Sequence, residues 1–99
     1  MEFTQYNDAA EILKALGHPV RLCIVSNLLN QPLCNVTKMQ TCLSIPQSTV
    51  SQHLGVLKAK QIITGKRKGT EVCYEINPAL KPFIGALVSS LKMTAEWGL

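Results

Sequence analysis

The sequence lacks any apolar run long enough to cross a bilayer, because none of its hydrophobic stretches reaches the roughly 18–20 residues required. Its first residues, MEFTQYND, are acidic and lack the apolar segment of a secretory leader. These absences exclude a membrane-spanning protein and predict a cytoplasmic one. In that reducing compartment, the four cysteines are expected to be thiols rather than a disulfide framework.

Acidic residues are missing from the middle of the chain, since none of the six lies between Glu11 and Glu71. Four of the ten cations fall within nine positions of this acid-free region, at Lys60, Lys66, Arg67 and Lys68. The net charge is +4 and the pI is about 9.0. This distribution predicts contact with nucleic acid or another polyanion, with a solvated basic face as the alternative.

The residue patterns that catalysis needs are also missing. The two histidines, His18 and His53, are far apart in the sequence, and there is no glycine-rich phosphate loop and no carboxylate pair in a plausible cleft. Cys–His catalysis needs a spatial partnership that the sequence does not suggest. We therefore expect no enzyme activity and no cofactor.

The most informative stretch that is present is PQSTVSQHLGVLKA, residues 46–59. Val50, Leu54 and Leu57 are spaced so that they share one face of a helix. The remaining face is polar and has no carboxylate. Short and amide side chains near a helix N-terminus are what a helix entering the DNA major groove needs. An ordinary amphipathic helix with a solvated polar face is the alternative.

The neighbouring segments predict a winged helix-turn-helix. A short helix expected over residues 35–43 has only a brief connection to the next one, so a helix-turn-helix is predicted over about 35–59. Two β-like runs, around 62–64 and 71–76, flank GKRKGT and predict a hairpin wing over about 62–77. Its adjacent cations would repel one another in a purely structural turn, but they suit a phosphate backbone.

Apolar helices are predicted at both ends of the chain. One covers residues 7–16, a buried second helix opens at Pro19, and a last helix covers about 79–96. Arg21 is the only charge of the second helix and should reach solvent, a phosphate or a carboxylate. The fold is thus expected to be a single domain over residues 1–99, mostly α with a small β-hairpin wing.

The two terminal helices are too apolar to be covered easily by their own chain. We expect a dimer through these helices, with a last helix folded back onto its own core as the alternative. The interface side chains predicted for that dimer are Ile12, Leu16, Leu80, Ile84, Leu87 and Leu91.

Two segments carry a family resemblance. LKALGHPVRLCI, residues 13–24, and QSTVSQHLGVL, residues 47–57, resemble the ArsR/SmtB family of bacterial repressors, and the similarity covers about residues 9–78. Within that family the chain is most similar to the metal-independent branch. The resemblance implies a homodimer that binds an inverted repeat in double-stranded DNA near a promoter and blocks transcription. In many members an inducer then releases the DNA, but the sequence does not identify one here.

The resemblance also implies residue roles on matching positions. Base edges would be contacted by Gln47, Ser48, Ser51 and Gln52. Phosphates would be contacted by Thr49 and Lys58 and by the wing cations Lys66, Arg67 and Lys68. His53 lies beside the apolar stripe, where it either packs or hydrogen-bonds inside the fold or reads a base.

The metal sites of the family are incomplete in this chain. The family's paired cysteines at the third helix are reduced to Cys34, because Val36 occupies the second position. The last helix, which carries Asp and His ligands in other members, has no Asp, Glu, His or Cys between residues 79 and 94. Since Zn²⁺ takes about four ligands, no metal site is predicted.

A thiol or soft-metal response through Cys34 and Cys42 is an alternative to a simple repressor. On one helix these residues would be separated by about 12 Å of rise, which is too far for one metal ion or for a disulfide, but the objection weakens if Cys34 lies outside the helix. Cys23 is expected to be a small buried hydrophobe, and Cys73 a poorly reactive thiol beside Glu71 and Glu75. Four inert thiols, or a protein-interaction module that binds no DNA, are the further alternatives.

Overall fold

The computed structural model describes residues 2–32 and 35–94. Within these residues the chain forms five α-helices, two short 3₁₀-helices and one two-stranded hairpin. In chain order they are η1 (Thr4–Tyr6), α1 (Asn7–Leu16), α2 (Pro19–Leu28), α3 (Val36–Leu43), α4 (Gln47–Ala59), β1 (Ile63–Lys68), β2 (Glu71–Ile76), η2 (Pro78–Leu80) and α5 (Lys81–Ser90).

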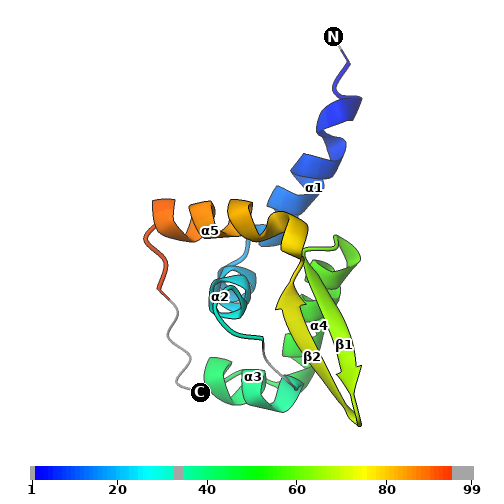
Figure 1. Ribbon diagram of the computed structural model, residues 1–99, viewed down its shortest axis with the longest axis vertical. Helices are drawn as coiled ribbons and strands as arrows, with labels where there is room; N and C mark the ends of the chain where they lie inside the picture. The colour runs from blue at the N-terminus through cyan, green and yellow to red at the C-terminus, as the bar shows by residue number, and fades with distance from the viewer. Residues whose placement is uncertain (1, 33–34, 95–99) are drawn as a thin grey trace.

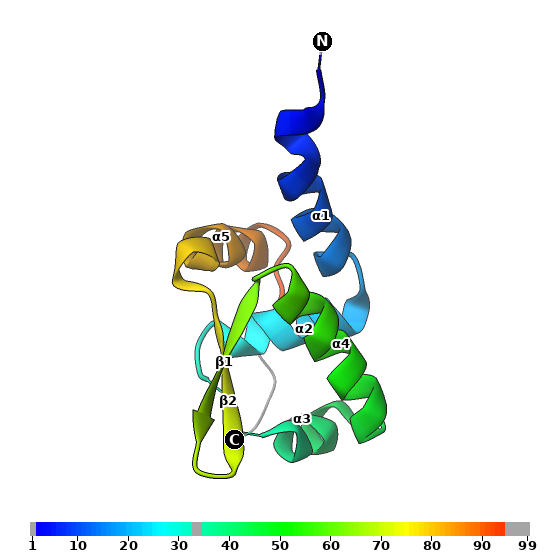
Figure 2. The ribbon, with the colours of Figure 1, turned by 90° about the vertical axis from the view of Figure 1, so that its right-hand side faces the viewer.

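The helices are arranged along the longest axis of the molecule. Helix α2 runs through the middle, α5 crosses one side of it, and α3 lies on the other (Figure 1). Helix α1 and the residues ahead of it (residues 2–16) project beyond α5 as an arm that extends away from the body, as both views show (Figure 2). The arm contributes to a length of 47 Å, against 28 and 23 Å in the other two directions.

One hydrophobic core joins the helices to the base of the hairpin. Helix α2 supplies Ile24, Val25 and Leu28, which are at most 2% exposed. Helix α4 supplies the predicted stripe of Val50, Leu54 and Leu57, again at most 3% exposed. Each such side chain stabilises the fold by about 1.5–3 kcal/mol when it leaves water. The stripe therefore fixes α4 in one rotation and directs its opposite face outward.

The hairpin is a regular antiparallel pair whose register runs from Ile63 opposite Ile76 to Lys68 opposite Glu71. Gly69 and Thr70 form its two-residue turn, and Gly69 has a φ of +62°. A positive φ at the first central residue suits a tight hairpin and is easiest for glycine. Because so short a turn is enough, the three cations expected in the connecting segment lie on β1 instead.

The last helix is shorter than the range of about 79–96 expected from its apolar stripe. Helix α5 ends at Ser90, and Lys92 then adopts a left-handed conformation with a φ of +57°. The Lys92 and Met93 N–H groups donate to the carbonyls of Ser89 and Val88, at 3.3 and 3.0 Å. These bonds satisfy carbonyls at the helix end. Leu91 continues the apolar spacing, so nothing in the sequence marks this stop.

Two side chains expected at a dimer interface belong to the core of a single chain. Leu16 is 3% exposed and Ile84 is 0% exposed. They face the helices packed beneath α1 and α5, so the chain covers part of each apolar stripe itself. Ile12, Leu80 and Leu87 are half-buried and Leu91 is exposed. In the described part of the chain, no helix has the length and apolarity needed to cross a membrane.

Candidate nucleic-acid interface

The outward face of α4 carries a set of exposed polar side chains. Gln47, Ser48, Ser51 and Gln52 are exposed, whereas Thr49 is half-buried. Lys58 is also exposed, but it lies in the last turn of α4, about 16 Å along the helix axis from Gln47. The structure thus groups the first four at the N-terminal half of α4 and sets Lys58 apart from them.

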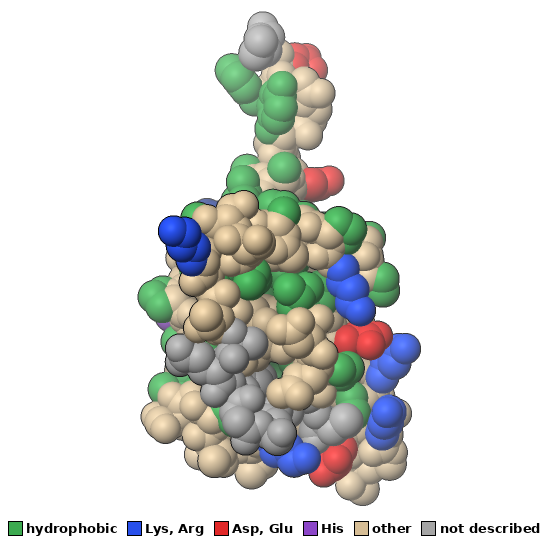
Figure 3. Space-filling model, turned by 60° about the vertical axis from the view of Figure 1, so that its left-hand side comes forward, with side chains coloured by type: hydrophobic (Ala, Val, Ile, Leu, Met, Phe, Trp, Pro, Cys, Tyr) green, Lys and Arg blue, Asp and Glu red, His purple; other side chains and the backbone are tan. Residues whose placement is uncertain are grey.

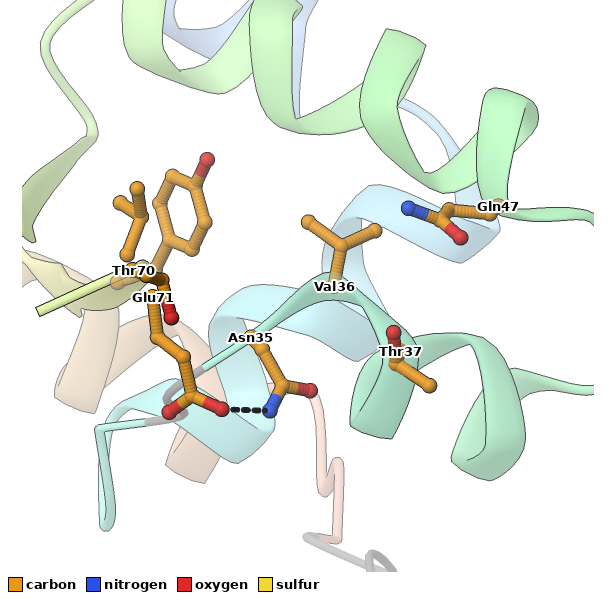
Figure 4. A pocket seen from close by; sticks show the side chains of 8 residues that line it. Asn35, Val36, Thr37, Gln47, Thr70 and Glu71 are labelled. Carbon is orange, nitrogen blue, oxygen red and sulfur yellow. Dashed lines mark hydrogen bonds between the residues drawn. The ribbon is translucent and has the colours of Figure 1, made fainter.

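The N-terminal end of α4 and the turn of the hairpin lie at the same end of the molecule, opposite the arm (Figures 1 and 2). An open hollow separates them, lined by the start of α3, the first residue of α4 and the hairpin turn (Figure 4). The Asn35 side-chain oxygen accepts from the Lys38 N–H at 2.8 Å and so caps α3, while its Nδ2 donates to Glu71 Oε1 at 2.9 Å. Asn35 thereby connects the helix-turn-helix to β2.

The cations of the hairpin are partly balanced by acids on the neighbouring strand. Lys66 Nζ lies 3.4 Å from Glu75 Oε1, and Lys68 is paired in register with Glu71. Arg67 and Lys68 form no ion pair among the described residues. Alternate residues of a strand point to opposite faces, so Arg67 points away from the face of Lys66 and Lys68. The sequence shows the cations but not this arrangement of acids.

His53 is half-buried and packs against the start of α2 rather than extending from the polar face of α4. Its Nδ1 is 3.2 Å from Arg21 Nη1, and its ring centroid is 4.5 Å from that of His18. A guanidinium group can only donate, so Nδ1 accepts and the ring proton resides on Nε2. Burial lowers the pKa of His53, and the charges of His18 and Arg21 lower it further. Arg21 was expected to reach solvent, a phosphate or a carboxylate, but its partners are this ring and the Ala15 carbonyl.

The cysteines are in several different states. Cys42 and Cys23 are half-buried free thiols, and the Cys23 carbonyl accepts from Asn27 Nδ2 at 2.8 Å. Cys73 is buried on β2 and is disulfide-bonded, which departs from the expectation of four thiols. Cys34 lies outside the described residues. Within residues 2–32 and 35–94, no group of three or more Asp, Glu, His or Cys side chains is arranged to hold a metal ion.

Together these features define a winged helix-turn-helix. Helix α3 is joined to α4 by a short turn, α4 has an apolar inner face and a polar outer one, and a basic hairpin follows. The family described as "Bacterial regulatory protein, arsR family" matches residues 18–64.

Individual relatives agree with this match. The transcriptional repressor PagR of Bacillus anthracis is 43% identical over 77 residues, which are 78% of this chain and 77% of PagR. The repressor SmtB of Mycobacterium tuberculosis is 46% identical over 68 residues, 69% of this chain but only 50% of SmtB. The chain belongs to the ArsR family, as the two sequence segments predicted.

Solved structures support the same fold. The crystal structure of PagR superposes with a TM-score of 0.73 at 42% identity, over 87% of this chain and 99% of PagR. A solution structure of Mb0332 from Mycobacterium bovis is described as a homodimeric winged helix-turn-helix DNA-binding domain. It superposes with a TM-score of 0.78 at 26% identity, over 90% of this chain and 82% of the Mb0332 domain. The predicted fold class is confirmed, whereas membership of the metal-independent branch stays a prediction.

The half-buried position of His53 leads to a prediction about pH. The pKa of His53 in the folded chain is lowered below the value of about 6.5 expected for the unfolded chain. As pH falls, the unfolded state takes up its proton first, so the free energy of unfolding should decrease below about pH 6.5. Urea denaturation across this range would measure the decrease. His53→Asn keeps an acceptor without titrating, so its profile should be flatter, and identical profiles would contradict the assignment.

Proposed function

We propose that the protein is a homodimeric transcriptional repressor that binds an inverted repeat in double-stranded DNA. The observation that carries the proposal is the acid-free polar face of α4, at the same end of the molecule as the basic hairpin. The names of PagR and SmtB as repressors support it. The whole chain would act as one domain, in the cytoplasm, where such a regulator meets DNA. Because the relatives are regulators, we assign no catalytic role to any residue.

In this proposal α4 enters the major groove by its N-terminal half. Gln47 and Gln52 have the amide groups that pair with adenine, and Ser48 and Ser51 have hydroxyls that either donate or accept. Nothing lies within 4 Å of a Cβ added at Gly55 on the same face, so the helix backbone itself is open to close approach there. Thr49 and the more distant Lys58 are assigned to phosphates.

The hairpin would lie along the phosphate backbone. Lys66, Arg67 and Lys68 are all exposed, and Arg67 and Lys68 are without an ion pair in the described structure. Each phosphate that these cations neutralise releases condensed counterions. Glu71 and Glu75, on the opposite strand, would be repelled by the same backbone, so we expect the hairpin to approach DNA through β1 rather than through β2.

The dimer would form through the arm and α5. Phe3, Tyr6 and Leu13 are 67, 54 and 56% exposed, and hydrophobic side chains are visible at the outer end of the arm (Figure 3). The arm borders an apolar pocket lined by Ala9, Ile12, Leu13, Leu80 and Phe83. An isolated helix as short as α1 is marginal in water, and exposed apolar patches of this kind mark association surfaces.

A second copy is the occupant that fits this surface best. A two-fold axis brings the same patch of both chains together, and Mb0332 is described as homodimeric. Of the side chains predicted from the sequence, Ile12, Leu80, Leu87 and Leu91 remain in the proposed interface. Leu13 and Phe83 join them, and the buried Leu16 and Ile84 are left out.

A thiol- or soft-metal-responsive repressor using Cys34 and Cys42 remains the alternative. Cys42 is a free thiol on α3. Fluorescence anisotropy of the protein on DNA, with full reductant and again after mild oxidation, separates the two. DNA binding that is lost only on oxidation would favour the thiol response. DNA binding that is unchanged by oxidation would exclude the thiol response. A winged-helix module that binds protein instead of DNA would show no DNA affinity in either state.

The base-reading role of α4 can be tested with Gln47→Ala and Ser51→Ala. Each change should lower affinity for the selected operator by about 1–3 kcal/mol and relax specificity at one position of each half-site. Anisotropy titrations on the operator and on duplexes with single base changes would measure this. An equal loss on random DNA would show that these residues do not read bases.

The hairpin's phosphate contact can be tested with Arg67→Ala. Binding to every duplex should weaken, and the slope of log K against log salt should become shallower by about 1 because one phosphate contact is lost. Lys81→Ala is the matched control, since Lys81 is also an exposed cation but lies on α5, outside the hairpin. An unchanged slope for Arg67→Ala would place this side chain off the backbone.

The dimer can be tested by placing a charge in the proposed interface. Phe83→Glu should shift the protein from dimer to monomer in light scattering behind size exclusion, because a carboxylate would be buried without a partner. Val56→Glu is the control, since Val56 is 38% exposed and Phe83 is 39% exposed. A wild-type monomer, or a Phe83→Glu variant that stays dimeric, would contradict the interface.

A further inference from the structure

Arg21 joins three helices through a single side chain. It is the third residue of α2, and its Nε–H donates to the carbonyl oxygen of Ala15 at the end of α1. Its Nη1 lies 3.2 Å from Nδ1 of His53, in the middle of α4. Arg21 therefore contacts both the arm proposed to form the dimer and the helix proposed to read DNA.

The end of α1 leaves a carbonyl for Arg21 to bind. The last carbonyls of a helix have no partner within the helix, and here Gly17 N–H donates to Lys14 and His18 N–H donates to Leu16. The Ala15 carbonyl between them accepts from Arg21. A cation at this helix end is also favoured by the helix dipole. The planar guanidinium can reach two partners in fixed directions, which a lysine ammonium cannot reproduce.

The His53 ring is held from a second side. His18 caps α2 by accepting from the Val20 N–H at 3.1 Å, and its ring is tilted 47° against that of His53. Both contacts to His53 thus come from the first turn of α2, next to the joint with α1. A separate side-chain contact between α1 and the end of α4 is the ion pair of Lys60 with Glu11, which is open to solvent.

We infer that Arg21 and His53 are positioning residues that fix the direction of α4 relative to α1. In the proposed dimer α1 belongs to the interface, so the angle between α1 and α4 sets the separation of the two α4 helices. That separation must match the spacing of two half-sites on DNA. The inference rests on the proposed function, and it adds residues that set operator spacing without touching a base.

The experiment uses the full chain and a DNA duplex that the wild-type protein selects from a random pool. The central spacer of that duplex is then shortened and lengthened one base pair at a time, and Kd is measured on each duplex and on a single half-site. The wild type should prefer one spacer. Arg21→Ala should bind the duplex with that spacer about tenfold more weakly. Its affinity should also depend less on spacer length, so that the plot of Kd against spacer length is flatter. Its affinity for the single half-site should change little.

Matched variants separate positioning from simple stability. His53→Leu removes the acceptor, so its Kd should depend less on spacer length than that of the wild type. His53→Asn keeps an acceptor near the position of Nδ1, so its preference for one spacer should match that of the wild type. Glu11→Gln removes the exposed ion pair between the same two helices and should leave the profile unchanged. If Arg21→Ala does not fold, Arg21→Lys and His53→Leu carry the test.

Two results would overturn the inference. An unchanged spacer profile in Arg21→Ala and His53→Leu would show that these residues do not set the spacing. A loss of the same size on every spacer and on the half-site would show that they only stabilise the fold. A wild-type protein that selects no duplex would instead overturn the proposed function, and this inference with it.

Discussion

Burial of one apolar stripe on α4 is the constraint on which the rest of the arrangement depends. Val50, Leu54 and Leu57 lie against the core formed by α2 and the base of the hairpin, and they leave only one rotation open to α4. The polar side chains on the opposite side of α4 must then face outward, and these include Gln47, Ser48, Ser51 and Gln52. The chemistry offered to a partner is thus set by packing on the opposite side of the same helix, at a gain of about 1.5–3 kcal/mol for each buried side chain.

Electrostatics then decides what kind of partner suits this surface. The outward face of α4 has no carboxylate, and the acids of the hairpin are held by neighbours, Glu75 by Lys66 and Glu71 by Asn35. Arg67 and Lys68 remain available on β1. The opposite end of the molecule has a different character, because the arm exposes the apolar Phe3 and Tyr6 beside the carboxylates of Asp8 and Glu11. One end is therefore suited to a polyanion and the other to an apolar surface, with Arg21 and His53 between them.

The sequence predicted the parts of the structure that repeat locally and missed those that depend on distant contacts. The spacing of Val50, Leu54 and Leu57 allows only one buried face, and the wing was predicted within about a residue of its observed bounds. The predicted end of the last helix, at about residue 96, was wrong, because Lys92 adopts a left-handed conformation that is usually taken by glycine and that ends the helix. Leu16 and Ile84 were assigned to the interface because spacing alone cannot tell an inner stripe from an outer one. His18, Arg21 and His53 were visible as residues, but their meeting depends on how three helices pack.

Whether the polar face of α4 reads DNA can be measured by selecting DNA with this 99-residue protein from a pool of random duplexes. A dimer that reads DNA through α4 should enrich an inverted repeat with half-sites about one helical turn, ~10 base pairs, apart. The enriched duplex should bind at least about 10³-fold more tightly than a scrambled one at physiological salt. If no repeat is enriched, or if the enriched and scrambled duplexes bind equally, then the polar face of α4 does not read DNA.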